Sequence, residues 1–295
     1  MTLSVRFYKR LILVVLVLMI VIPTARSISL RARNAALERE LEQMTQQAQA
    51  GHSGQALELT GTAIDYQTLY PELYSTAQVP DQRQKTPGTV YLTFDCTPGE
   101  NTWQILDTLD EYGVKATFFV TAGSGAEADS VLREIINRGH TVGLGSYSGS
   151  YQEIYRSVAD YLGDFQEIYD CVYTATGVRA QIFRFPGGSV NAYNSGIYRE
   201  LIAEMLRRGF VFFDWNVSGE DASITDPSPQ HIVQSIRAGM EHEDWAIVSL
   251  RDSFGKEAVA RALPDVIKTL RDGGYELKPL AADVMPVIFS YQNAP

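Results

Sequence analysis

The stretch TVYLTFDCTPGENT, residues 89–102, is typical of a buried β-strand that runs into a turn and then into a helix. The strand ends on an acid, Asp95, and Cys96, Thr97 and Pro98 follow it directly. In α/β barrels, an acid at the carboxyl end of a strand stands where function is usually found. The stretch therefore raises the question of whether Asp95 and its cysteine neighbour form a working site.

From this strand onward, short apolar runs alternate with segments of helical periodicity. Near-continuous apolar strands that alternate with helices indicate a parallel sheet that is buried on both faces. Seven such runs predict an α/β fold, a distorted seven-stranded parallel (β/α) barrel with its functional residues at the carboxyl ends of the strands. The predicted strands are 89–95, 115–121, 141–146, 181–186, 210–217, 246–251 and 275–280.

The segments between these runs have the apolar spacing of helices. The segment 103–113 places its apolar residues on one face, and 130–139 ends on a glycine, a residue that often terminates helices. A long helix is predicted over 151–176 and a last one over 257–272. Another helix is expected before the 246–251 strand, because each parallel strand needs a crossover connection.

The N-terminus has the pattern of a membrane segment. Arg6, Lys9 and Arg10 precede an uninterrupted apolar run, residues 11–22. Basic residues before such a run indicate a cytosolic N-terminus and a chain that crosses the membrane after it. A cleaved signal peptide is the alternative, and both mean export. Pro23 stands where a cleavage site requires a small residue, which favours an uncleaved, single-pass anchor in the cell membrane.

These patterns divide the chain into four parts. Residues 1–27 are predicted to form a cytoplasmic tip and a signal-anchor transmembrane helix, and residues 28–50 a helical stalk. Residues 51–87 are predicted to be a linker, and 88–295 the α/β domain. The net charge of −10 argues against a nucleic-acid partner, because such a surface would need a basic stripe.

The residues at the strand ends resemble the motifs of the polysaccharide deacetylase family (NodB homology domain, carbohydrate esterase family 4) over residues 88–280. The order and spacing of five segments carry the resemblance. They are VYLTFDCTPGENTWQILDTLDEYGVKATFFV (90–120), RGHTVGLGSYSGSY (138–151), FRFPGG (183–188), FFDWNVSGEDA (212–222) and IVSLRDS (247–253).

The resemblance implies metal-assisted deacetylation, but most of the residues that this chemistry needs are replaced. In the family, one Asp and two His hold a divalent metal such as zinc, a second Asp is the general base and a late His is the acid. Asp95 matches the base. Cys96 falls on the metal-binding Asp, Gly145 and Gly149 fall on the two metal-binding His, and Arg251 falls on the acid. We therefore expect no metal site and no cofactor.

The histidine count supports this expectation without the resemblance. The chain has only four histidines: His52, His140, His231 and His242. His52 is in the predicted linker, and the other three lie before strands rather than after them. No histidine is expected at the carboxyl ends of the strands. Arginine stays cationic and cannot replace histidine as a proton donor of matched pKa.

Several residues have alternative interpretations from sequence. Arg184 matches the family arginine that orients the base, so Asp95 and Arg184 are predicted to form a vestigial pair. Cys96 has two functional interpretations, a thiolate metal ligand and a nucleophile, but the preferred interpretation gives it no function. Both Cys96 and Cys171 are expected to be free thiols. The predicted substrate groove consists of Tyr147, Pro186, Trp215 and Asp221, with Trp215 either in that groove or in the core.

The sequence therefore predicts a membrane-anchored, exported protein with an inactive deacetylase-like domain. Its expected role is to bind N-acetylated cell-wall glycan or to regulate a wall enzyme or another envelope protein. The alternative is an active deacetylase of peptidoglycan or a chitin-like glycan, with a metal site rebuilt from Asp95, Cys96 and either Asp214 or Asp221.

Overall fold

A computed structural model describes residues 65–76, 79, 83–121, 126–219, 227–252 and 257–290. All of them belong to one compact unit, residues 63–295. The predicted membrane segment, the stalk, most of the linker and Asp221 lie outside the described residues. Within the described ranges, no helix is long and apolar enough to span a bilayer.

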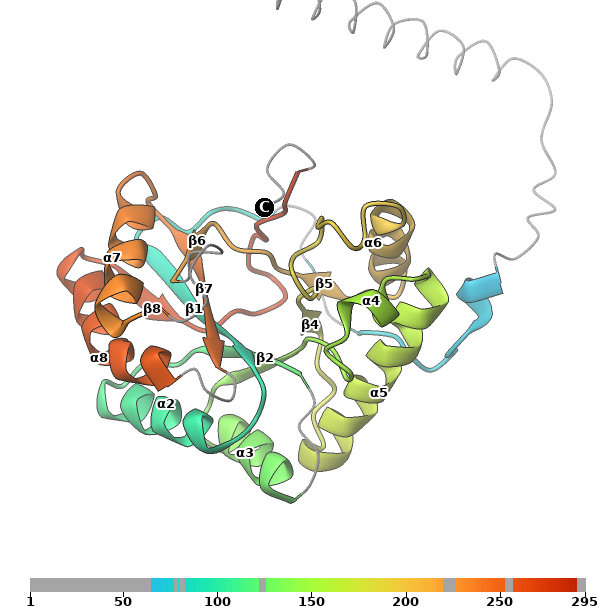
Figure 1. The fold of residues 1–295 in the computed structure, drawn as a ribbon, viewed down its shortest axis with the longest axis horizontal. Coiled ribbons are helices and arrows are strands. Elements are labelled where there is room, and N and C mark those ends of the chain that lie inside the picture. The colour runs from blue at the N-terminus through green and yellow to red at the C-terminus, as the bar shows by residue number, and fades with distance from the viewer. Residues whose placement is uncertain are drawn as a thin grey trace, which may run out of the picture. The chain divides into compact units, whose positions relative to one another are not determined.

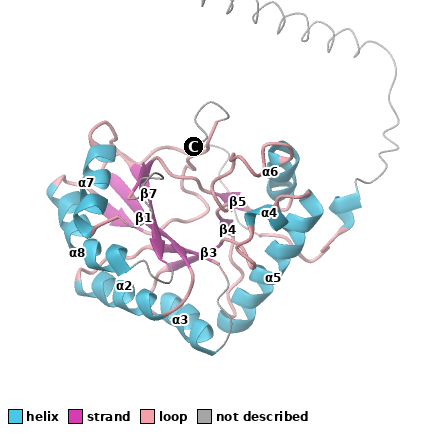
Figure 2. Cartoon of the chain, in the orientation of Figure 1, coloured by secondary structure: helices cyan, strands magenta, loops and turns pink. Residues whose placement is uncertain are grey.

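The unit is a curled parallel sheet, a half-barrel with helices packed around its outer side (Figure 1). Figure 2 shows the strands gathered inside an arc of helices. The order along the sheet is β5-β4-β3-β2-β1-β7-β6, and β8 pairs with β1 off this path. The strands are β1 (Thr89–Cys96), β2 (Thr117–Val120), β3 (Thr141–Leu144), β4 (Ile182–Phe183), β5 (Val211–Phe212), β6 (Val217–Ser218), β7 (Ala246–Asp252) and β8 (Glu276–Lys278).

Strand β1 lies at the centre of this sheet. It pairs with β7 along Val90–Cys96, and its other edge is shared by β8 at the start and by β2 at the end. Every residue of β1 except Asp95 is buried. The apolar run that predicted this strand is therefore explained by burial on both faces, and Asp95 is the one position where the strand opens to a cavity.

The predicted strand 210–217 is wrong as a single element. It forms two short strands, β5 and β6, at opposite ends of the strand order. Between them, the amide of Phe213 still bonds to β4 at Phe183, whereas the amide of Asn216 bonds to Ile247 of β7. The chain thus leaves one edge of the curled sheet and joins the other. The mostly apolar run FVFFDWNV does not reveal this change of partner.

The predicted helices are present with one break, and α6 is an additional helix that was not predicted. The predicted helix 151–176 is interrupted, because Ser157 caps a new helix by accepting a hydrogen bond from the amide of Asp160. The helix 257–272 has the predicted bounds. The helices are η1 (Asp65–Thr68, a 3-10 turn), α2 (Glu100–Glu111), α3 (Ala126–Asn137), α4 (Tyr151–Ile154), α5 (Val158–Thr176), α6 (Tyr198–Arg207), α7 (Pro229–Met240) and α8 (Glu257–Asp272).

Part of the predicted linker packs against the domain. Leu73 is fully buried, and Arg208, which follows α6, is fully buried beside it. The Arg208 guanidinium donates to Glu204 at 2.7 Å. It also donates to the backbone carbonyls of Tyr66, Leu69, Tyr70 and Leu73. Arg208 therefore holds residues 66–73 by their backbone, which a sequence pattern cannot reveal because the carbonyls carry no side-chain signature.

His140 lies just before β3, at the end of the sheet away from the site, as predicted. It is buried, its Nδ1 accepts from the amide of Ala116, and its Nε2 has no hydrogen-bond partner. The histidine is therefore only half satisfied. Burial, reinforced by the charge of Lys115, lowers the pKa of His140 from 6.5 to about 4.

This pKa predicts a loss of stability in mild acid. The unfolded chain takes up the proton near pH 6.5 and the folded chain only near pH 4, so stability is full above pH 6.5 and falls as the pH drops toward 4. The His140 contribution to this loss is about 3 kcal/mol. Urea unfolding from pH 7 to pH 4 measures it against His140→Asn, which keeps an acceptor without the titration. Parallel curves for the two proteins would contradict the assignment.

Candidate functional site

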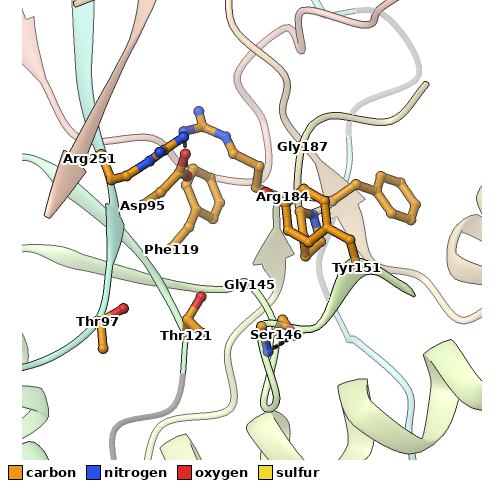
Figure 3. A pocket seen from close by; sticks show the side chains of 13 residues that line it. Asp95, Thr97, Phe119, Thr121, Gly145, Ser146, Tyr151, Arg184, Gly187 and Arg251 are labelled. Atoms are coloured by element: carbon orange, nitrogen blue, oxygen red, sulfur yellow. Dashed lines mark hydrogen bonds and ion pairs between the residues drawn. The ribbon is translucent and has the colours of Figure 1, made fainter. Parts of the chain in front are cut away.

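A pocket of about 290 Å³ opens at the carboxyl ends of the strands, where the sequence predicts function. Figure 3 shows Asp95 and Arg251 on one side of it, Thr97 and Thr121 below, and Ser146 and Tyr151 on the other side. Its walls combine a carboxylate, two guanidinium groups, hydroxyls and aromatic rings. The lining residues are Asp95, Thr97, Phe119, Thr121, Gly145, Ser146, Gly149, Tyr151, Arg184, Phe185, Pro186, Gly187 and Arg251.

Asp95 and Arg184 form the predicted pair. Arg184 Nη1 donates to Asp95 Oδ1 at 3.0 Å, a contact that a dashed line beside Asp95 marks in Figure 3. Arg184 Nε donates to the carbonyl of Phe213 at 3.0 Å, and Ser249 Oγ lies 3.4 Å from the other Asp95 oxygen. The arginine is buried, whereas 38% of the Asp95 side chain is exposed. The pair therefore holds a carboxylate in fixed orientation with one side open to the pocket.

Aromatic rings keep Arg184 in place. Its guanidinium carbon lies 4.3 Å from the ring centre of Phe119 and 5.2 Å from that of Trp215. The Trp215 ring in turn packs edge-on against Phe289 at 4.8 Å. Trp215 is thus partly buried and supports Arg184 from outside the pocket lining, so neither sequence alternative, core or groove wall, describes it fully.

The other predicted groove residues have different outcomes. Pro186 lines the pocket as expected. Tyr147 does not line it but lies in a neighbouring groove with an exposed ring. Asp214, which was an alternative ligand of the rebuilt metal site rather than a groove residue, is buried and accepts hydrogen bonds from Ser189 and from the amide of Phe289, so it holds the loop after β4 and does not line the pocket. Asp221 lies outside the described residues.

Cys96 points away from the pocket, which contradicts the alternative of a metal site rebuilt from Asp95 and Cys96. Successive side chains of a strand alternate between faces, and β1 extends through Cys96. Its Sγ lies 3.2 Å from Asp252 Oδ2 and 3.8 Å from Thr102 Oγ1 under α2. Burial, with the charge of Asp252, raises the pKa of the Cys96 thiol well above 9.0. The residue therefore belongs to a buried polar cluster and is not a thiolate in the pocket.

This placement predicts slow alkylation of Cys96. Iodoacetamide at pH 8 is expected to modify the partly buried Cys171 in the folded protein and to leave Cys96 intact, because the thiolate is the reactive form and Cys96 is fully buried. In urea both thiols should react. Peptide mass spectrometry of the two samples provides the measurement. Modification of Cys96 at the rate of Cys171 in the native protein would show that Cys96 faces solvent.

The residues present do not fit a divalent metal. Gly145 and Gly149 line the pocket without a side-chain ligand, and Cys96 faces the other way. Arg251 adds a positive charge to the wall, and an arginine cannot donate a lone pair to a metal ion. Among the described residues, no group of three or more His, Cys, Asp and Glu is arranged to hold a metal ion.

The backbone at the two glycine positions also disfavours a histidine. A Cβ on Gly145 would lie 2.8 Å from the carbonyl oxygen of Val120, closer than real Cβ atoms approach backbone. Gly149 has φ +69°, a conformation that L side chains rarely adopt. The loop after β3 therefore has a shape that matches the glycines it carries.

The chemistry of the pocket is the formation of hydrogen bonds with a ligand. Asp95 can accept from a hydroxyl or amide N–H, and the hydroxyls of Thr97 and Thr121 can donate or accept. The Ser146 hydroxyl already donates to Asp164, so it can only accept from a ligand. The ring of Tyr151 adds an apolar wall. Thr121 and Ser146 stand at the ends of predicted strands, which is the signal that locates them. Phe119 carried no such signal, because it reads as one more apolar residue of a buried strand.

Comparison with known proteins agrees with this fold and site. The profile of the polysaccharide deacetylase family matches residues 82–206. The catalytic domain of a peptidoglycan N-acetylglucosamine deacetylase from Eubacterium rectale is 35% identical, with a TM-score of 0.65, and the match covers 70% of this chain and 96% of that domain. The chain therefore belongs to the polysaccharide deacetylase family.

Two further proteins are similar to this chain. A peptidoglycan-N-acetylglucosamine deacetylase from Bacillus cereus is 26% identical over 208 residues, 69% of this chain and 73% of the relative. A solved pseudoenzyme of carbohydrate esterase family 4 from Bacillus anthracis has a TM-score of 0.56 at 21% identity. The match covers 69% of this chain and 68% of the Bacillus anthracis chain. At that identity the second match shows a shared fold only.

Proposed function

We propose that this protein binds N-acetylated cell-wall glycan in the pocket at the strand ends and does not hydrolyse it. The observation that supports the proposal is that the pocket keeps hydrogen-bonding groups but has no side chains at the positions of the family metal ligands that could hold a metal. Asp95 is held by Arg184 and open to a ligand, while the three positions that match family metal ligands offer none. A hydrogen-bonding pocket remains, without the Lewis acid that deacetylation in this family would use.

The class of ligand is suggested by the relatives. Two of them are peptidoglycan N-acetylglucosamine deacetylases. An N-acetyl sugar presents hydroxyls and an amide N–H, which Asp95 can accept, and a methyl group, which Phe119 and Tyr151 can contact. The apolar run after the basic N-terminus supports the further proposal that the chain is anchored in the cell membrane, with this domain outside.

The test combines binding with turnover. Isothermal titration of the full-length chain with chitooligosaccharides is expected to show binding, and an acetate assay with added zinc is expected to show no release. Asp95→Asn keeps the shape of the pocket but weakens the acceptor, so binding should fall about tenfold, the loss of one charge-assisted hydrogen bond. Absence of binding by the wild-type chain would overturn the proposal.

An active deacetylase is the second candidate, favoured by the retained Asp95–Arg184 pair at 3.0 Å. Under this candidate, zinc would produce acetate release that Asp95→Asn abolishes, because the same carboxylate would serve as the general base. The acetate assay therefore separates the two functions. Binding that survives zinc treatment without acetate release supports the first.

A further inference from the structure

We propose that a groove beside the pocket, lined by Tyr70 and Tyr147, binds a further sugar unit of the same glycan chain. This inference rests on the proposed function, since it extends the ligand of the pocket. The groove has a volume of about 320 Å³. It is lined by Tyr70, Tyr147, Ser148, Glu153, Ile154, Arg156, Ala159, Asp160, Gly163, Asp164 and Glu167.

The groove adjoins the pocket through one short segment. Ser146 lines the pocket and its neighbour Tyr147 lines the groove; likewise Tyr151 lines the pocket and Glu153, in the same helix α4, lines the groove. The segment 146–154 is thus a wall with a cavity on each side. A linear glycan that occupies the pocket and crosses this wall would place its next units over the groove.

This wall is held in one conformation by Asp164 of α5. Its carboxylate accepts from Ser146 Oγ at 2.7 Å, from the amide of Tyr147 at 2.8 Å and from the amide of Ser148 at 2.7 Å. These contacts orient the start of the loop before any ligand arrives. A preorganised loop lowers the entropy cost of binding.

Tyr70 comes from the segment that Arg208 holds. It has φ +49° and is the one non-glycine residue with positive φ among the residues that the structure describes. Its carbonyl accepts from Arg208 Nη1 at 2.9 Å. A Cβ on Gly163 would lie 3.2 Å from the Tyr70 hydroxyl, so the phenol lies directly over that glycine. An unfavourable backbone conformation is therefore maintained where it places an aromatic ring in the groove.

The chemistry of the groove fits a neutral sugar. Tyr70 and Tyr147 are 36% and 43% exposed, and tyrosine combines an apolar face with a hydroxyl, as amphipathic sugar rings require. Asp164 is bound by the loop, and Asp160 pairs with Arg156 at 3.1 Å. Glu153 and Glu167 remain as acceptors for sugar hydroxyls, and the net negative charge disfavours an anionic ligand.

Chain length provides the test. Titration of the full-length protein with the disaccharide and the pentasaccharide of N-acetylglucosamine is expected to give tighter binding of the pentasaccharide. Tyr147→Ala and Tyr70→Asn should each weaken pentasaccharide binding about tenfold, as loss of an aromatic anchor does, and leave disaccharide binding unchanged. Asparagine is used at position 70 because it tolerates a positive φ better than alanine. Tyr147→Phe, which keeps the ring, should bind as the wild type does.

Tyr173→Ala is the matched control. This tyrosine lies on α5, the helix that forms one side of the groove, but it does not line the groove itself. It is 41% exposed. It should leave the affinity for both sugars unchanged. Equal affinity of the wild type for the two sugars would contradict the proposal that the groove binds a further sugar unit. Unchanged pentasaccharide affinity of the Tyr147→Ala and Tyr70→Asn variants would contradict it as well. Neither result would contradict binding in the pocket. If neither sugar binds the wild type, the proposed function fails as well, so the two failures are distinguishable.

Discussion

Replacing Arg208 with methionine is expected to lower the free energy of unfolding by about 4 kcal/mol, because removal of one partner from a buried ion pair leaves the other partly uncompensated. The side chains of Arg208 and Glu204 are 0% and 1% exposed. The change also leaves the carbonyls that Arg208 binds in the 66–73 segment without their donor. Urea denaturation measures the loss.

Arg208→Met should also release the 66–73 segment from the rest of the domain. Limited proteolysis is therefore expected to cut within residues 65–76 sooner in Arg208→Met than in the wild type. Because Tyr70 belongs to this segment, the variant should also lose the preference for the pentasaccharide. The two readouts link a stability contact to the proposed groove.

Arg207→Met is the matched control for this prediction. Arg207 also bonds Glu204, at 2.7 Å, and it reaches Tyr74 and the carbonyl of Gln67. Its side chain is 37% exposed, so its removal is expected to cost only about 1 kcal/mol. Equal losses from the two variants would show that burial of Arg208 does not determine its contribution.

Restoring the family metal ligands is expected to destabilise the protein without creating a zinc site. The variant combines Cys96→Asp, Gly145→His and Gly149→His. A side chain at Gly145 meets the Val120 carbonyl and costs roughly 1–3 kcal/mol as overpacking does. A side chain at Gly149 adopts a left-handed conformation at roughly 1–2 kcal/mol. The total loss is therefore several kcal/mol.

The third change introduces like charges. Cys96 Sγ lies 3.2 Å from Asp252 Oδ2, so an aspartate at this position would bring a second carboxylate beside the buried Asp252. Burial already raises the pKa of Asp252, which also accepts from Asn101 and Thr102 at 2.7 Å. Two carboxylates this close share a proton rather than ionise together, and they would face α2 instead of the pocket.

Zinc calorimetry and urea unfolding test the restored variant. Gly196→His controls for adding an imidazole, because a Cβ on Gly196 meets nothing within 4 Å and the residue does not have positive φ. This control should retain wild-type stability. A restored variant that binds one zinc tightly and unfolds like the wild type would show that only the ligand side chains, and not the backbone, separate this chain from a metal enzyme.

Much of the architecture was predictable because it depends on local pattern. Apolar runs buried on both faces identified β1, β2, β3 and β7, and the amphipathic run 257–272 identified α8 with its observed bounds. The pair of Asp95 and Arg184 could be predicted because Arg184 matches the arginine that orients the base in the family motif, and the structure confirms the contact at 3.0 Å.

The remaining features of the fold and site depend on the direction of the chain and on contacts with segments far away in the sequence. The change of partner between β5 and β6 is set by the curvature of the whole sheet and leaves no trace in FVFFDWNV. Whether Cys96 shares the pocket with Asp95 depends on one residue of strand length, since side chains alternate only while the strand continues. The segment held by Arg208 resembles a linker in composition.

By itself, the sequence determined the alternation of strands and helices, the family motifs and the replacement of the metal-ligand positions, because these are properties of residue type and spacing along one chain. Only the tertiary structure decided that Cys96 faces α2, that Tyr147 and Tyr70 share a groove, and that residues 66–73 belong to the domain. Those facts arise from contacts between residues far apart in sequence. Side-chain direction and backbone hydrogen bonding determine which of these residues lie in contact.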